Sequence, residues 1–437
     1  MKKARPTLWI AVGVQVLILA LLVRCSPPPK PTSVPVPTST PVPSPTSTPT
    51  PVPPTSTPTP ALPTLTLWHD LPEKQSALLE TQVRKFEAGQ TAVQVVLKRY
   101  ESEDALERAV SAGGSDFDVV LGNARALSFI RDRQLIQALD ALFDRNFFAG
   151  LARPGVEAVT YGDKIWGVPQ TLGMHLMLFY NAKLVSNPPA DTNSLVELAA
   201  SLSKPGRYGL GMNSLDPLWA LSWLSAYGGW PVDEQARPTL NTASMVQALT
   251  FLRNLALEQK VMAATADYET GLQAFKTGQT ALWIDGEWVL SELRDAKDMQ
   301  WGVARLPILS ETRLDPASLV AGKYFMMGSH LTGAKRDAAL SLIKQLVSPE
   351  NATQWVQQFR MLPASLVALN SNLIQDDPFM RISAAQMLAG RGVGLSGGLQ
   401  QAMEAMRGPL EDVLSNRITP KEAARGMQAR AEAPGAP

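Results

Sequence analysis

Residues 390–398, with the sequence GRGVGLSGG, contain a spacing that carries chemistry in other proteins. Gly394, Ser396 and Gly398 form Gly-x-Ser-x-Gly, the turn that presents the nucleophilic serine in one class of hydrolases. In that class the catalytic histidine follows the serine along the chain, whereas the last histidine here is His330. The order of the residues therefore excludes this type of hydrolase.

Metal chemistry has no sequence signal of its own. The chain has three histidines and one cysteine, and their spacing matches no zinc-ligand pattern, so we expect no metal and no cofactor. Carboxylates are plentiful, and a pair of them could serve a glycosidase. A secreted glycosidase therefore stays open as an alternative function.

Aromatic and polar side chains occur together at the end of the first expected strand. Sugars present polar rims and apolar C–H faces, so their sites combine aromatic platforms with hydrogen-bonding groups. Trp68 lies near the end of the segment TLTLWH, which ends at His69, and Asp70 follows. Ligands bind beyond the carboxyl ends of strands in open α/β sheets. Trp68 and His69 are therefore candidates, and a core tryptophan with a neighbouring histidine is the alternative.

The elements that must position such residues alternate along the chain. Segments 64–69, 92–97 and 116–122 have the composition of strands, and amphipathic helix patterns lie between them. Regular alternation predicts an α/β fold with a largely parallel sheet. Residues 64–437 exceed the size at which one core usually divides. We therefore expect two lobes with a cleft between them.

The N-terminal segment has the pattern of an export signal or membrane anchor, residues 1–25. Lysines and an arginine precede an apolar run from Leu8 to Val23, and Cys25 follows directly after Arg24. A single cysteine at this place is typical of a lipoprotein signal, although such signals prefer a small residue where Arg24 stands. We favour lipidation at Cys25, and an uncleaved anchor is the alternative.

Two further features of the sequence are a proline-rich linker and a net charge close to zero. Residues 26–63 are rich in proline, serine and threonine, which predicts a disordered stalk. The chain has 40 Lys and Arg against 39 Asp and Glu, and five of the positive residues precede residue 64. The rest is slightly acidic and offers no basic field for nucleic acid.

Ordered blocks of the chain resemble the extracellular solute-binding proteins of ABC importers, in the family that includes maltose-binding protein. The blocks cover nearly all of residues 64–437, and include SDFDVVLGNARAL, YGDKIWGVPQTLGMHLMLFYNAKLV, SAYGGWPVDE, AFKTGQTALWIDGEWVL and SPENATQWVQQFRMLPA. The resemblance implies a two-lobe type II periplasmic-binding-protein fold. Lobe 1 would comprise about 64–172 and 307–361, and lobe 2 about 173–306 and 362–437, with hinges near Gly173, Leu306 and Leu362.

The same resemblance implies further site residues. Trp288 in IDGEWV stands where the sugar binder uses a stacking tryptophan, and Met174 stands where it has a cleft glutamate. Solvated loop residues are the alternative reading of Asp216 and Trp219. The expected ligand-binding residues are Trp68, His69, Asn123, Arg125, Met174, Asp216, Trp219, Trp230, Asp285, Trp288 and Tyr324.

The expected function is capture of a sugar or oligosaccharide outside the cell membrane by hinge closure, with delivery to the ABC permease. No bond of the ligand changes, so the protein is not expected to be an enzyme. The expected partners are the solute, the permease subunits and the membrane. The protein is expected to be a monomer that its N-terminal lipid or anchor attaches to the membrane. Besides the glycosidase, a binder of the same fold for a polyamine, phosphodiester or peptide stays open.

Overall fold

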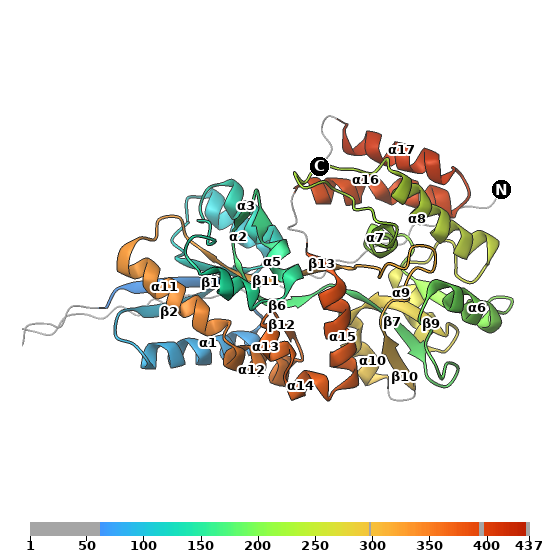
Figure 1. Ribbon diagram of the computed structural model, residues 1–437. Helices are drawn as coiled ribbons and strands as arrows, with labels where there is room; N and C mark the ends of the chain where they lie inside the picture. Colours follow the sequence, from blue (N-terminus) through green and yellow to red (C-terminus); the bar gives the residue numbers. More distant parts are fainter. Residues whose placement is uncertain (1–61, 297–298, 393–396, 434–437) are drawn as a thin grey trace, which may run out of the picture. The chain divides into compact units, whose positions relative to one another are not determined.

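The computed structural model describes residues 62–296, 299–392 and 397–433, which belong to one compact unit, Pro60–Pro437 (Figure 1). Within this part of the chain the strands form two main sheets and a small two-stranded ladder. The small ladder pairs β4 (Thr160–Tyr161) with β5 (Lys164–Ile165). Cys25 and the apolar run before it lie outside the described residues. In the described ranges, no helix combines the length and apolar character that crossing a membrane requires.

The first sheet has its strands in the order β12-β6-β11-β3-β1-β2, with β13 paired to β11. In chain order these strands are β1 (Thr64–His69), β2 (Gln94–Arg99), β3 (Val119–Gly122), β6 (Val168–Gly173), β11 (Leu319–Met327), β12 (Leu362–Pro363) and β13 (Arg391–Gly392). Every residue of β3 is buried, because helices cover both faces of this part of the sheet. The sheet is therefore the centre of a core.

Ten helices of the described chain supply side chains to that first core. They are α1 (Glu73–Ala88), α2 (Glu103–Ser111), α3 (Ala124–Asp132), α4 (Arg145–Ala149), α5 (Arg153–Ala158), α11 (Gly333–Leu346), α12 (Pro349–Phe359), α13 (Leu366–Leu369), α14 (Asn372–Gln375) and α15 (Pro378–Ala389). In α1, Leu79, Val83 and Phe86 recur at steps of four and three residues, so all three are buried on one face.

The second sheet has the order β10-β7-β9-β8 and separates two smaller cores. Its strands are β7 (Leu176–Asn181), β8 (Leu210–Met212), β9 (Leu282–Gly286) and β10 (Trp301–Ala304). Side chains alternate along β7: Leu176 and Leu178 join one core, while Met177 and Phe179 join the other. A strand segment that is apolar at every position, as in β7, therefore indicates that both faces of the sheet are buried there.

Helical segments cover both faces of this second sheet. They are α6 (Thr192–Leu202), α7 (Pro217–Ala226), α8 (Ala243–Arg253), η1 (Asn254–Glu258), α9 (Tyr268–Lys276), η2 (Glu287–Val289), α10 (Leu290–Asp295), α16 (Gly397–Leu414) and α17 (Pro420–Ala431). The two-lobed α/β architecture is thus present, with one set of cores around each sheet.

The expectation of a largely parallel sheet is wrong for both sheets. β1 pairs in parallel with β2 and β3, but β11 runs antiparallel to β3 and β6, and β7 runs antiparallel to β9 and β10. Helical crossovers connect β1, β2 and β3, which keeps these strands parallel. Strands β6 and β11 connect instead to the second lobe, so nothing obliges them to run in the same direction.

The chain passes from the first sheet to the second within two residues, because β6 ends at Gly173 and β7 begins at Leu176. It returns through residues 305–318, close to the expected hinge at Leu306. We expected the next crossing at Leu362, but Leu362 pairs with Leu172 of β6 and is buried in the first core. The passage to α16 follows β13 instead.

Helix α15 lies beside both sheets (Figure 1). Met380 and Ala384 are buried in the first core. Phe379 and Trp301 of β10 both pack against the core that contains Met177 and Phe179, and their ring centroids are 4.7 Å apart. The helix therefore joins the two lobes at the point where β6 becomes β7.

Candidate functional site

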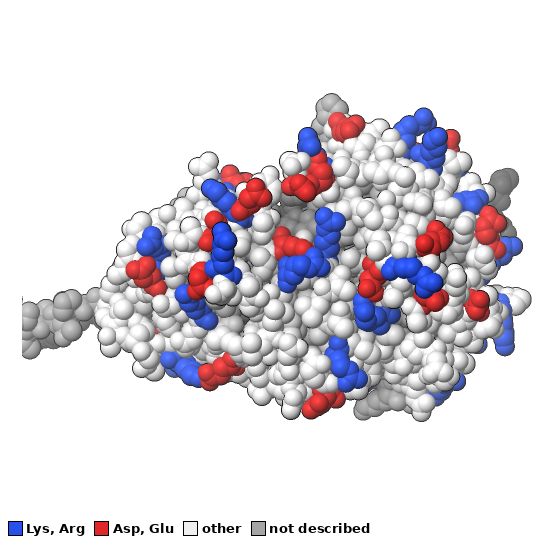
Figure 2. Space-filling view, in the orientation of Figure 1, with Lys and Arg blue, Asp and Glu red and all other residues white. Residues whose placement is uncertain are grey.

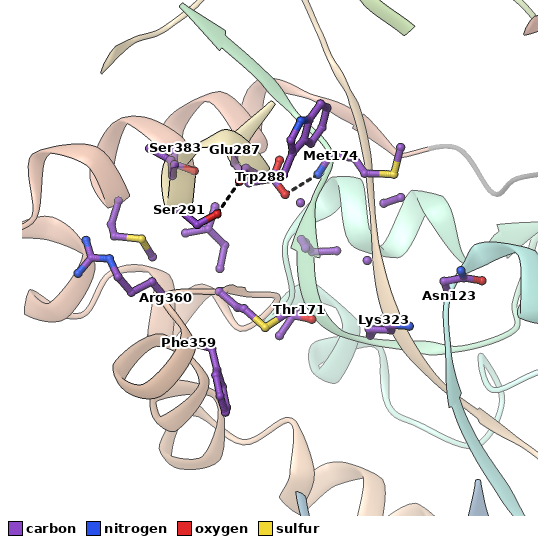
Figure 3. A pocket seen from close by; sticks show the side chains of 18 of the residues that line it. Asn123, Thr171, Met174, Glu287, Trp288, Ser291, Lys323, Phe359, Arg360 and Ser383 are labelled. Carbon is purple, nitrogen blue, oxygen red and sulfur yellow. Dashed lines mark hydrogen bonds between the residues drawn. The ribbon is translucent and has the colours of Figure 1, made fainter. Parts of the chain in front are cut away.

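A cavity of about 450 Å³ lies where β6 leads into β7. Its walls come from the ends of β6 and α12, the middle of β11, the start of α3, and the segments η2, α10 and α15 (Figure 3). Elements of both lobes therefore contribute. Its apolar lining includes Leu172, Met174, Leu290, Phe359, Met361 and Met380, and its polar lining includes Asn123, Ser291, Arg294, Lys323, Arg360 and Ser383.

Glu287 approaches the chain crossing from the second lobe and also lines the cavity. Its Oε1 accepts a hydrogen bond from the backbone N–H of Met174 at 3.0 Å. Gly173 makes this approach possible, since a Cβ at position 173 would overlap the Glu287 carboxylate. Met174 itself has φ of 65°, so the backbone turns through the left-handed region at this point. The hinge geometry and the carboxylate position are therefore coupled.

The second oxygen of Glu287 is buried and has no hydrogen-bond partner among the described residues. His175 Nδ1 lies 3.9 Å from this Oε2, beyond hydrogen-bond distance, and is likewise buried without a partner. His175 Nε2 lies 2.8 Å from the Ser383 hydroxyl. Burial lowers the pKa of His175 to about 3, so its ring is neutral at neutral pH. Burial raises the pKa of Glu287 to about 7.

Trp288 stands next to Glu287 and places its indole beside the cavity (Figure 3). Its Nε1 donates to the Tyr268 hydroxyl at 3.1 Å, and its ring meets Trp219 edge to face at 6.0 Å. The ring also lies over Gly286, where any Cβ would overlap it. These contacts hold the indole of Trp288 in place at the edge of the cavity that it lines.

The cationic residues that line the cavity differ in their partners. Lys323 forms an ion pair with Asp70, and Arg360 forms one with Asp377. Within the described residues, Arg294 has no ion pair. Over the face drawn in Figure 2, positive and negative side chains are interspersed, and neither sign forms a continuous patch.

The structure brings three of the expected ligand-binding residues to this cavity: Asn123, Met174 and Trp288. Asn123 also caps α3, its side-chain oxygen accepting from the N–H groups of Arg125 and Ala126 at 3.0 Å each. Arg125 points elsewhere, pairing with Asp104 and Glu107 on α2.

Three other expected residues are buried in the first lobe and do not line the cavity. Trp68 is 2 % exposed and meets Phe117 edge to face, which is the core role given above as its alternative. His69 is 1 % exposed and accepts from the Leu71 N–H. Tyr324 lies in the middle of the first sheet with its ring fully buried. The burial of these three side chains keeps them out of the cavity lining, although Lys323 of β11 reaches it.

The remaining expected residues lie in the second lobe, apart from the cavity lining. Asp216 caps α7 and lies 3.5 Å from Arg407, and the Trp219 indole donates to the Ile284 carbonyl at 2.7 Å. Asp285 is buried and accepts from the Trp283 indole and the Gly286 N–H. Trp230 lines a separate pocket of about 200 Å³, where Arg391 lies over its ring.

Most of the lining residues were not among those expected, and they include Glu287, Lys323, Phe359, Arg360 and Ser383. Only Glu287 carried a signal, its place directly before Trp288 in IDGEWV. The others approach the cavity from β11, the end of α12 and α15, and no sequence spacing connects these elements to η2.

Two α/β lobes joined by crossing segments, with a cavity at the crossing, define the two-lobe type II fold of periplasmic binding proteins. A family profile described as bacterial extracellular solute-binding protein matches residues 81–382. The chain belongs to this family. Its members are binding proteins that act outside the cytoplasm, in agreement with the expected class.

Individual relatives agree with the family assignment. The chain is 25% identical over 324 residues to a maltotriose-binding protein of Pyrococcus abyssi, covering 72% of this chain and 69% of that protein. It is similar to the structure of a maltose/maltodextrin-binding domain from Bdellovibrio bacteriovorus bound to maltotriose, with a TM-score of 0.63, 26% identity, and coverage of 84% and 98%. A cyclo/maltodextrin-binding protein complexed with maltotetraose gives a TM-score of 0.76 at 20% identity, with coverage of 86% and 98%.

Proposed function

We propose that this protein is the substrate-binding subunit of an ABC importer and that it captures a sugar or oligosaccharide outside the cell membrane. The observation that carries the proposal is the cavity at the crossing of the lobes, which Trp288 and the neighbouring Glu287 line together with Asn123 and Lys323. An aromatic face beside hydrogen-bonding groups suits a sugar. One relative is a maltotriose-binding protein and another was solved with maltotriose bound, so maltotriose is the first ligand to test.

Capture would proceed by closure of the two lobes around the ligand. Contacts from both lobes are complete only in the closed state, so the ligand favours that state by its difference in affinity for the two. Met174 and His175 connect the sheets and are the shortest crossing, so we expect the φ and ψ change of closure to be concentrated there.

The alternative functions find less support in the lining of the cavity. A cationic polyamine would meet Lys323, Arg294 and Arg360, against the single lining carboxylate of Glu287 among the described residues. A glycosidase needs two carboxyl groups facing one scissile bond. Asp285, the nearest second carboxylate in sequence, is turned toward Trp283 and Gly286.

Delivery to the permease and attachment to the membrane extend the same proposal. A lipid on Cys25, or the uncleaved segment before it, would tether the binding protein through the linker of residues 26–63. The intact mass of the purified N-terminal peptide tests this part, since a peptide that begins at Met1 overturns lipidation.

The proposed ligand class is tested with the full chain in mild detergent. We expect maltotriose to raise the unfolding midpoint, because a ligand that binds only the folded state stabilises it, and spermidine to leave it unchanged. Chromatography of the sugar after prolonged incubation completes the test. A stabilising spermidine effect, or steady accumulation of shorter sugars, would overturn the proposal.

A further inference from the structure

The aromatic ring that lines the cavity belongs to a cluster of three rings in the second lobe. Trp288 Nε1 donates to the hydroxyl of Tyr268, the first residue of α9, at 3.1 Å. Trp219 of α7 meets both rings edge to face, with its centroid 6.0 Å from that of Trp288 and 6.4 Å from that of Tyr268. Of the three rings, that of Trp288 lines the cavity. The other two therefore support it from within the lobe.

Asp285, at the end of β9, interacts with the same tyrosine. Its carboxylate is 0 % exposed and accepts from the Trp283 indole at 2.9 Å and from the Gly286 N–H at 2.7 Å. Burial raises the pKa of Asp285 to about 7, and hydrogen bonds from Trp283, Gly286 and Tyr268 oppose that rise. Burial also raises the pKa of Tyr268, so its hydroxyl keeps the proton at neutral pH. The phenol can therefore donate to the ionised carboxylate and accept from Trp288.

The indole, the phenol and the carboxylate form a hydrogen-bonded chain with one direction. An ionised carboxylate can only accept, so it orients the Tyr268 O–H toward itself and leaves the lone pairs of the phenol to the Trp288 N–H. Hydrogen bonds in such a chain polarise and strengthen one another. An indole N–H can only donate, so Trp288 loses this partner if the chain is broken. The orientation of the ring thus depends on a carboxylate that does not line the cavity.

The charged groups near Asp285 leave this chain intact. In the described ranges no lysine, arginine or histidine forms an ion pair with Asp285. Glu292 on α10 raises the pKa of Asp285 but is itself 3.9 Å from Lys276. Glu287, which follows on η2, accepts from the Met174 N–H at the crossing. The hydroxyl of Tyr268 therefore does not compete with a cation for Asp285.

We propose that Asp285 and Tyr268 are positioning residues of the sugar site, holding the Trp288 indole in the orientation that the ligand meets. The inference rests on the proposed function, and it gives a role to two residues that do not touch the sugar. A ring that is held before the ligand arrives loses little conformational freedom on binding. Asp285, a candidate ligand contact from its place in IDGEWV, would act through Tyr268 instead.

Calorimetric titration of the full chain with maltotriose in detergent measures the effect on affinity. Tyr268→Phe removes the hydroxyl and keeps the ring, while Asp285→Asn removes the charge and keeps the shape. Each should bind maltotriose about threefold to tenfold more weakly, as the loss of one hydrogen bond implies. The double variant should bind no more weakly than the weaker single variant, because Asp285 acts through Tyr268. Tyr227→Phe, in a ring that packs on Phe251 elsewhere in the second lobe, is the matched control and should bind as wild type.

Nuclear magnetic resonance of the full chain, labelled with ¹⁵N in the tryptophan indoles, gives a readout that a merely structural role would not move. The Trp288 N–H signal is identified by its absence in Trp288→Phe. In ligand-free Tyr268→Phe and Asp285→Asn this signal should shift and exchange faster with water, since its acceptor is lost or misdirected. The signal of Trp301, whose N–H donates to the Leu293 carbonyl at 2.9 Å, should stay in place.

The outcomes separate the inference from the function on which it rests. If the wild type binds maltotriose and both single variants keep its affinity, or if the Trp288 signal is unchanged in both, the inference is overturned and the proposed function stands. Losses that multiply in the double variant, or an equal loss in Tyr227→Phe, would overturn it as well. If the wild type binds no sugar, the proposed function fails, and the inference with it. Melting curves confirm that every variant is folded at the temperature of titration.

Discussion

Gly173 and Glu287 stand 114 positions apart but meet at the crossing of the lobes. The carboxylate of Glu287 takes up the space that a Cβ of residue 173 would need. The same carboxylate accepts the N–H of Met174. Because residue 173 has no side chain, the carboxylate of Glu287 in the second lobe can reach the backbone N–H of Met174.

Replacing Gly173 by Ala should weaken ligand binding more than it weakens the fold. The added Cβ meets the far end of a flexible side chain, so Glu287 can rotate away, at the cost of about 1 kcal/mol for the lost Met174 hydrogen bond. Chemical denaturation and titration with maltotriose measure the two effects. Gly426→Ala in α17, where an added Cβ meets nothing within 4 Å, should leave affinity unchanged and raise stability slightly. Equal affinity in Gly173→Ala and wild type would contradict the coupling.

Glu287→Gln should stabilise the ligand-free protein at high pH. The folded-state pKa of Glu287 is raised to about 7 from 4.5, so the folded protein favours the protonated form, and folding free energy is lost as the pH rises from 4.5 to 7. The amide removes that cost, a gain on the order of 1–3 kcal/mol at pH 8 that shrinks to nothing below pH 4.5. Urea denaturation at several pH values measures it. An advantage of the variant that grows toward low pH would have the wrong sign.

Trp288 and Trp230 offer a matched pair of tryptophans. Trp288 lines the cavity and Trp230 lines the separate pocket, and both contribute to packing. Either change to Ala should lower stability, by about 3 kcal/mol for a well-packed tryptophan. Only Trp288→Ala should weaken maltotriose binding, by at least about tenfold as expected for a central aromatic anchor. If Trp230→Ala loses affinity and Trp288→Ala does not, the ligand occupies the other pocket.

Local patterns predicted the elements of this protein better than their directions. The alternation in residues 64–122 yielded β1, α1, β2, α2 and β3 in order, because each buries one regular face. No local pattern predicts that β11 runs antiparallel to its neighbours, because its direction depends on the path that the chain takes between residues 173 and 319. The place of Leu362 in the first sheet was missed for the same reason: its partner Leu172 is far away in sequence.

Tertiary packing likewise decided which candidate residues reach the cavity. Trp68 and Trp288 both combine an aromatic ring with polar neighbours, but Trp68 sits within an interior strand, whereas Trp288 lies in η2, the turn that follows the end of β9. Glu287 stands directly before Trp288 in the sequence, but no sequence spacing predicts its contact with Met174. Its carboxylate matters because Gly173 and Met174 approach it from the other lobe.

Asp118 should be a determinant of stability rather than of binding. Its buried carboxylate accepts from the Thr66 N–H at 2.7 Å and pairs with His330 and Lys335, joining β1 and the segment before β3 to the start of α11. In Asp118→Ala the side chains of His330 and Lys335, 53% and 38% exposed, are rehydrated, but the Thr66 N–H loses its acceptor, so we expect a loss of about 1–3 kcal/mol. The neighbouring Asp116, 67% exposed and 3.4 Å from Lys98, is the control, and its change to Ala should alter stability by less than about 0.5 kcal/mol. Denaturation midpoints measure both variants, and maltotriose affinity should be that of the wild type in each. A loss of affinity in Asp118→Ala at temperatures where the variant is fully folded would show that this ion cluster reaches the ligand site.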